Sequence, residues 1–137
     1  MKKLLLIAAV TVAAAFAIVY FLFPKEEDDE TLKKYLSDNF AAYTAVASYM
    51  QQHPGLQVSN SKKEIPEGDI EADFKKVFSE TILYVKSVDG AVLFSTGHSD
   101  RTNSERFIIY SPSGAPAAYP DAFSAEKTDW YLCEVKG

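Results

Sequence analysis

The stretch TILYVKSVDGAVLFST, residues 81–96, contains two apolar-rich runs joined by Asp89-Gly90. Asp-Gly between such runs is typical of a two-residue hairpin, because a type I′ turn needs positive φ at both central positions. The two runs are therefore predicted to pair as antiparallel strands. The turn sets four cross-strand pairs, which are Val88 with Ala91, Ser87 with Val92, Val85 with Phe94 and Leu83 with Thr96. One face then carries a core set, Leu83, Val85, Val92 and Phe94, and the other carries the mixed set Tyr84, Lys86, Leu93 and Ser95.

Two more strands are predicted after the hairpin. RFIIYS at residues 106–111 and DWYLCEV at residues 129–135 are rich in β-branched and aromatic side chains, and Pro112-Ser113-Gly114 ends the first of them. The segment between them, residues 115–127, contains two prolines and several alanines, so we expect a long surface crossing.

Helical spacing of apolar residues begins upstream of the hairpin. A first helix is predicted from Thr31 to about residue 53, capped by Asp29 or Thr31, and a shorter one follows the capping residue Asp69. Residues 56–68 between them read as a loop. The fold class is therefore α+β, with two helices packed on a four-stranded antiparallel meander. The apolar stripes of the two helices are Leu32, Leu36, Phe40, Tyr43, Ala47 and Met50, then Ile70, Phe74, Val77 and Phe78.

The N-terminal segment Leu4 to Phe23 holds twenty residues without a charge. A helix of that length spans roughly 30 Å, the thickness of the hydrocarbon core of a bilayer. Lys2 and Lys3 precede it and five acids follow Lys25, so the N-terminus is expected to be cytoplasmic. We expect a transmembrane signal-anchor at residues 1–24, an acidic juxtamembrane segment at 25–30 and an extracytoplasmic domain at 31–137.

A cleavable signal peptide is the alternative for this segment. Small residues at Ala13, Ala15 and Ala17 offer a cleavage site, but six bulky residues follow them, so an uncleaved anchor is favoured. The only cysteine, Cys133, excludes both a lipoprotein and an intramolecular disulfide. Residues 25–137 hold 12 basic and 19 acidic side chains, a net charge of −7, which disfavours nucleic acid as a partner.

The most polar loop, Gly97 to Glu105, holds His98, Ser99, Asp100 and Arg101. Neighbours in one loop seldom converge as a hydrolytic triad, and Gly, Ser, Asp and Asn are ordinary loop residues. His53, His98 and Cys133 are the only soft-metal ligands and do not lie at motif spacing. We therefore expect no catalytic residue, metal or cofactor.

Aromatic residues are the remaining functional signal. If Trp130 and Tyr131 share a strand, their side chains point to opposite faces of the sheet. Exposed aromatic side chains favour protein contacts, because they bury a large area with little loss of entropy. The predicted partner-binding residues are Tyr84, Tyr110, Trp130 and Tyr131, together with His98, Asp100 and Arg101 of the polar loop.

We expect a non-catalytic, single-pass, membrane-anchored domain of a bacterial envelope protein, which contacts lipid through Leu4 to Phe23 and binds an envelope protein or peptide. Two alternatives stay open. The membrane helix, the proline after it, the continuing helix and the small antiparallel sheet resemble type IV pilins and pseudopilins, which implies a filament subunit. That family carries a glutamate early in its apolar stretch, whereas no acid lies between Met1 and Phe23 here. The last alternative is a small envelope hydrolase that uses His98 with an acid.

Overall fold

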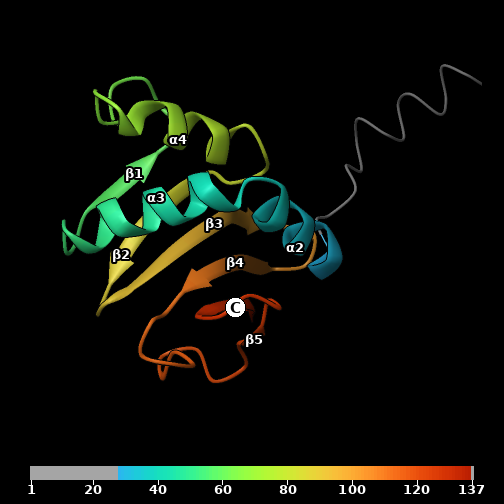
Figure 1. Ribbon diagram of the computed structural model, residues 1–137. Coiled ribbons are helices and arrows are strands. Elements are labelled where there is room, and N and C mark those ends of the chain that lie inside the picture. Colours follow the sequence, from blue (N-terminus) through green and yellow to red (C-terminus); the bar gives the residue numbers. More distant parts are fainter. Residues whose placement is uncertain (1–27, 137) are drawn as a thin grey trace, which may run out of the picture.

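The computed structural model of the chain describes residues 28–136, which form an α+β domain. Within that range, three helices lie over one face of a six-stranded antiparallel sheet of order β1-β2-β3-β4-β6-β5 (Figure 1). The elements are α2 (Asp29–Asp38), α3 (Phe40–Gln51), β1 (Gln57–Ser59), α4 (Ile70–Phe78), β2 (Tyr84–Val88), β3 (Ala91–Ser99), β4 (Ser104–Tyr110), β5 (Phe123–Ser124) and β6 (Trp130–Lys136).

The β2–β3 hairpin has the predicted register. Val88 pairs with Ala91 and Val85 with Phe94, and both turn residues have positive φ. Leu83, however, is 53% exposed, so its expected place in the core is wrong. The reason is that the pairing with β3 stops at Tyr84 and β3 becomes irregular between Ser95 and His98. Gly97, with φ of 84°, leaves there the space in which the Leu83 side chain lies.

The sheet has six strands within residues 28–136, so the expected number of four strands is wrong. The strands expected from the sequence are β2, β3, β4 and β6, which pair as antiparallel neighbours in that order, and β1 and β5 extend the two edges. β1 lies in the segment expected to be a loop and pairs with β2, which buries Val58. β5 lies in the expected surface crossing and pairs with β6. Strands of three and two residues are too short to show an alternating pattern, so their sequences gave no signal.

The predicted long helix is two helices, α2 and α3, which meet at Asn39. The backbone N–H of Asn39 still donates to Tyr35 O, but its side-chain Nδ2 donates to Glu80 Oε1 at 2.7 Å. The N-cap is Asp28, whose carboxylate accepts from the backbone N–H of Thr31 at 2.8 Å, so the expected caps Asp29 and Thr31 are wrong. Asp69 precedes α4 but makes no side-chain capping bond. The predicted stripes are nevertheless buried or pack against the core.

Apolar side chains fill both sides of the sheet. The larger cluster lies between the helices and the sheet and includes Trp130, Phe94 and Tyr43. A smaller cluster on the opposite face is built from Leu93, Phe107, Ile109 and Cys133, with Tyr119 and Ala122 packed against it. The segment before β5 therefore covers the second face rather than only crossing the surface. Its two prolines and several alanines predict a loop, but the sheet face beneath it is apolar.

No helix between Asp28 and Lys136 is long and apolar enough to cross a bilayer. The expected signal-anchor at residues 1–24 lies outside the described residues. The same holds for most of the acidic segment, of which Asp28, Asp29 and Glu30 are described.

Candidate functional site

Two of the predicted partner-binding residues belong to the core. Trp130 is only 2% exposed, and its ring packs against Phe40, Tyr43, Phe94 and Tyr110 at centroid distances of 5.0–6.3 Å. Tyr110 is half-buried by the same contact. Trp130 therefore stabilises the domain and presents no surface to a partner.

Tyr84 and Tyr131 lie on the opposite face of the sheet from the helices. The Tyr84 hydroxyl donates to Glu105 Oε1 at 2.6 Å, and the Ser95 hydroxyl donates to the same oxygen at 2.7 Å. Burial, and then the bond to Glu105, raises the pKa of Tyr84. Tyr131 is half-buried against the smaller apolar cluster. The two tyrosines are thus held by the domain's own contacts.

His98 lies at the end of β3, opposite Glu105 of β4. Its Nε2 is 3.6 Å from Asp100 Oδ1, while Asp100 and Arg101 are exposed in the turn that follows. Ser99 and Ser104 form the next cross-strand pair, so the alternation of side chains puts them on the face opposite to His98. The loop therefore does not place the imidazole against either serine hydroxyl.

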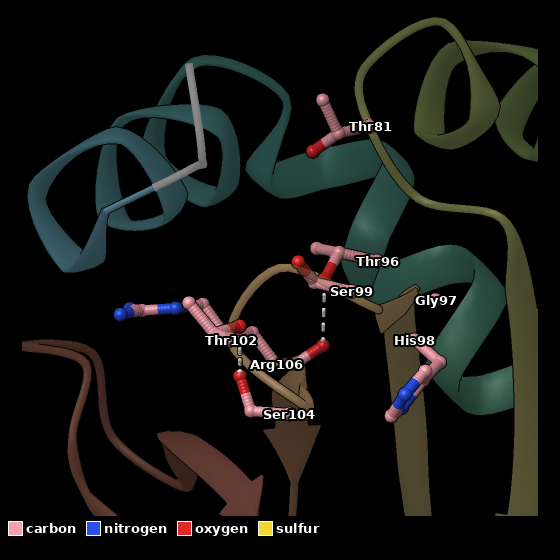
Figure 2. A pocket seen from close by; sticks show the side chains of 8 residues that line it. All are labelled: Thr81, Thr96, Gly97, His98, Ser99, Thr102, Ser104 and Arg106. Atoms are coloured by element: carbon pink, nitrogen blue, oxygen red, sulfur yellow. Dashed lines mark hydrogen bonds between the residues drawn. The ribbon is translucent and has the colours of Figure 1, made fainter. Parts of the chain in front are cut away.

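A small polar pocket of about 180 Å³ opens at this end of the sheet (Figure 2). The hydroxyl of Thr81 is buried there without a hydrogen-bond partner in the described part of the chain. The Arg106 side chain extends out of the pocket and bonds Asp29. The space suits a few ordered waters, each of about 30 Å³. The lining residues are Thr81, Thr96, Gly97, His98, Ser99, Thr102, Ser104 and Arg106.

A larger groove, of about 610 Å³, follows the outer edge of β6. We call it the β6 groove. It includes residues from both faces of the sheet, so it surrounds the strand edge instead of lying on one face. Its lining residues are Asp29, Arg106, Ala118, Tyr119, Pro120, Asp121, Phe123, Cys133, Glu134, Val135 and Lys136.

The outer edge of β6 has backbone groups in this groove that no strand among residues 28–136 pairs. β5 pairs only with Tyr131 and Leu132, so beyond Leu132 the edge has no strand partner among residues 28–136. Trp130 O accepts from Ala125 N–H and thus points outward. Because outward-pointing residues alternate along a strand, the backbone N–H and C=O of Glu134 and Lys136 also point outward. The groove therefore contains main-chain donors and acceptors of an edge strand that the described part of the chain leaves without a strand partner.

The wall on the helix side is an ion-pair network centred on Arg106. Its Nη1 donates to Asp29 Oδ1 at 2.7 Å, and its Nη2 lies 3.0 Å from Glu134 Oε2. One guanidinium thus ties the first turn of α2 to β4 and to the open edge of β6. These two ion pairs fix the position of this wall relative to β6.

The wall on the other side is largely apolar. Val135 is 40% exposed there, and Tyr119 and Pro120 also line the groove. Phe123, 42% exposed, pairs with Leu132 of β6, whose side chain faces the helices, so it lies on the helix side of the strand edge. Burial, and then Asp121 and Glu134, raises the pKa of the Cys133 thiol, so it stays protonated at neutral pH. The β6 groove therefore offers apolar contacts, charged groups and main-chain hydrogen bonds together.

None of the seven predicted partner-binding residues lines the β6 groove. Residues 28–136 contain no group of three or more potential ligands that could hold a metal ion. Comparison of the chain with family models, with curated proteins and with solved structures finds no match.

Replacing Arg106 by methionine should lower the free energy of unfolding by about 1–2 kcal/mol, because Asp29 and Glu134 lose their shared cation. Urea denaturation measures the change, and hydrogen exchange should show faster exchange in the first turn of α2. Lys75→Met is the matched control, since it removes only the exposed Lys75–Glu71 pair and should cost less than about 0.5 kcal/mol. Equal losses in the two variants would show that the network does not hold the wall.

Proposed function

We propose that the chain is a non-catalytic, single-pass, membrane-anchored domain of a bacterial envelope protein that binds another envelope protein in the β6 groove. The observation that carries this proposal is the open edge of β6 inside a groove with an apolar wall. An extended segment adds to such an edge as a further strand: main-chain hydrogen bonds supply affinity and the flanking side chains supply specificity. An exposed edge is otherwise a liability that soluble domains cover or charge.

The proposed anchor limits where the partner lies. Asp29 lines the groove and is six residues from Phe23, the end of the apolar segment. Six residues span at most about 21 Å when fully extended. If Leu4 to Phe23 crosses the bilayer, the Asp29 end of the groove is therefore held close to the extracytoplasmic surface of that membrane. A partner that is itself anchored in that membrane fits this position.

The membrane part is tested by proteolysis of intact cells that express the full-length chain with a C-terminal epitope. We expect added protease to remove the epitope while a cytoplasmic marker survives, because Lys2 and Lys3 keep the N-terminus inside. Recovery of the full-length chain in the water-soluble fraction would contradict the anchor, and an epitope that survives protease would contradict the orientation.

The binding part is tested in the same cells with a photoreactive amino acid at Phe123. We expect a cross-linked adduct of defined mass at Phe123, and none at Leu83, which is exposed but does not line the groove. Lys136→Pro should abolish the adduct, because proline removes an outward N–H, whereas Lys136→Ala keeps the N–H and should preserve the adduct. Adducts that are insensitive to Lys136→Pro would contradict strand addition.

A further inference from the structure

We propose that the envelope protein bound at the open edge of β6 is a second copy of this chain, so that the two sheets join through antiparallel β6 strands. This inference rests on the proposed use of the β6 groove for strand addition. It goes further by naming the occupant and the register. Glu134 of each copy faces Lys136 of the other, and the two Val135 side chains meet at the two-fold axis.

The backbone restricts the register to a few choices. Hydrogen-bonded antiparallel pairs form only between residues whose N–H and C=O point toward each other, here Glu134 and Lys136. Pairing Glu134 with Glu134 puts like charges opposite each other, and so does pairing Lys136 with Lys136. Pairing Glu134 with Lys136 puts opposite charges together twice, because the two-fold axis repeats the contact. It also lies beyond Leu132, in the stretch that β5 leaves open.

The charged groups are positioned for this exchange. Glu134 Oε2 is 3.0 Å from Arg106 Nη2, while Oε1 has only a 3.9 Å contact with Lys136 Nζ of its own chain. The Lys136 side chain is 79% exposed. Lys136 of a second copy can therefore approach Glu134 Oε1 without displacing Arg106. The edge is self-complementary in charge.

The apolar side of the edge is also self-complementary. Val135 lies on the face opposite to Glu134 and Lys136 and is 40% exposed. In the chosen register it meets Val135 of the second copy in a non-hydrogen-bonded pair, where side chains lie closest. Phe123, 42% exposed, also lines the groove, but it pairs with Leu132, so its side chain lies on the helix side of the edge. The pairing therefore covers the exposed Val135 side chain in both copies.

The symmetry of this pairing suits two chains anchored in one membrane. A two-fold axis between antiparallel strands of one sheet runs perpendicular to that sheet, so both copies place their helices on the same side. Asp29 of α2 lies on that side and at the joined edge. Both copies therefore present the start of α2 on the same side of the joined sheet. Tethering in one membrane raises the effective concentration, which compensates for a short contact.

The experiment uses the full-length chain in liposomes, with Cys133→Ala to remove the native thiol and Val135→Cys at the axis. Cα atoms of a non-hydrogen-bonded pair are about 4.5 Å apart, which lies within the range that a disulfide spans. We expect mild oxidation to convert most of the protein to a disulfide-linked dimer. Leu83→Cys in the same Cys133→Ala background is the control for random collision, since Leu83 is exposed away from the groove.

A charge variant separates the proposed register from non-specific contact. Adding Lys136→Glu to the Val135→Cys protein puts two carboxylates opposite each other and should lower the rate of cross-linking about fivefold or more. Lys136→Arg keeps the charge and should preserve the rate. Circular dichroism and urea denaturation verify that each variant remains folded, which matters because Val135 and Lys136 belong to β6.

The outcomes distinguish failure of this inference from failure of the proposed function on which it rests. Equal cross-linking of Val135→Cys and Leu83→Cys would overturn the second copy as the occupant. The proposed function would then stand if the photoreactive Phe123 protein still gave an adduct with a different protein, lost on Lys136→Pro. Absence of both the disulfide dimer and the adduct would overturn both proposals.

Discussion

Replacing Trp130 by alanine should lower the free energy of unfolding by about 3–5 kcal/mol, the range for deleting a fully buried large aromatic side chain. The indole is 2% exposed and touches rings from α3, β3 and β4, so its loss leaves a cavity that no single neighbour can fill. Urea denaturation followed by far-ultraviolet circular dichroism measures the change.

Tyr131→Ala is the matched control, because Tyr131 is the next residue on β6 but lies half-buried on the other face. We expect that variant to lose clearly less stability than Trp130→Ala. Trp130→Phe should fall between the wild type and Trp130→Ala, since it keeps one ring in the cluster. A loss below about 1 kcal/mol for Trp130→Ala would contradict the central place of this side chain in the core.

Trp130 also shows which features of the fold can be predicted from the sequence and which cannot. Its position on a strand predicts that it and Tyr131 face opposite sides of the sheet. Which side faces the helices depends on how β6 pairs with β4, about 25 residues earlier in the chain. The sequence therefore predicts Trp130 as a partner-binding residue, although its ring lies in the core. The β2–β3 register, by contrast, is fixed by a two-residue turn and was predictable.

The break between α2 and α3 has a similar long-range cause. Residues 31–53 carry one continuous apolar stripe, which predicts one helix. Asn39 instead bonds Glu80, 41 residues later, and the backbone leaves helical geometry there. The spacing of apolar residues along the helix cannot indicate a contact with a residue so far along the chain.

The β6 groove was not predictable for two reasons. Its open edge exists because β5 has only two residues and its pairing with β6 ends at Leu132, a limit that no sequence pattern indicates. Its wall joins Asp29, Arg106 and Glu134, which lie far apart in the chain. Exposure of Phe123 and Val135 also follows from the folded arrangement and not from their residue types. Residue types in the sequence thus indicate aromatic side chains as partner-binding residues, whereas the candidate site depends on the open edge of a strand.

Replacing Tyr43 by phenylalanine should make the domain markedly more resistant to alkaline unfolding. Tyr43 is fully buried, and its hydroxyl has no hydrogen-bond partner within residues 28–136. Burial, and then the charges of Glu80 and Tyr35, raises its pKa well above the ordinary value of about 10. Above pH 10 the unfolded chain therefore loses this proton while the folded chain keeps it. Stability then falls by about 1.4 kcal/mol per pH unit from this group alone.

Tyr43→Phe removes that slope, and it also removes an unpaired buried hydroxyl at neutral pH. Urea denaturation at pH 7 and at several values above pH 10 measures both effects. At pH 7 we expect the variant to be as stable as the wild type or more stable, by up to about 2 kcal/mol, because an unsatisfied buried polar group is costly. Tyr84→Phe is the control: its hydroxyl donates to Glu105, so its loss should cost about 1 kcal/mol at pH 7. If Tyr43→Phe were instead the more damaging variant at pH 7, the Tyr43 hydroxyl would have to make a stabilising bond, and the alkaline argument would fail with it.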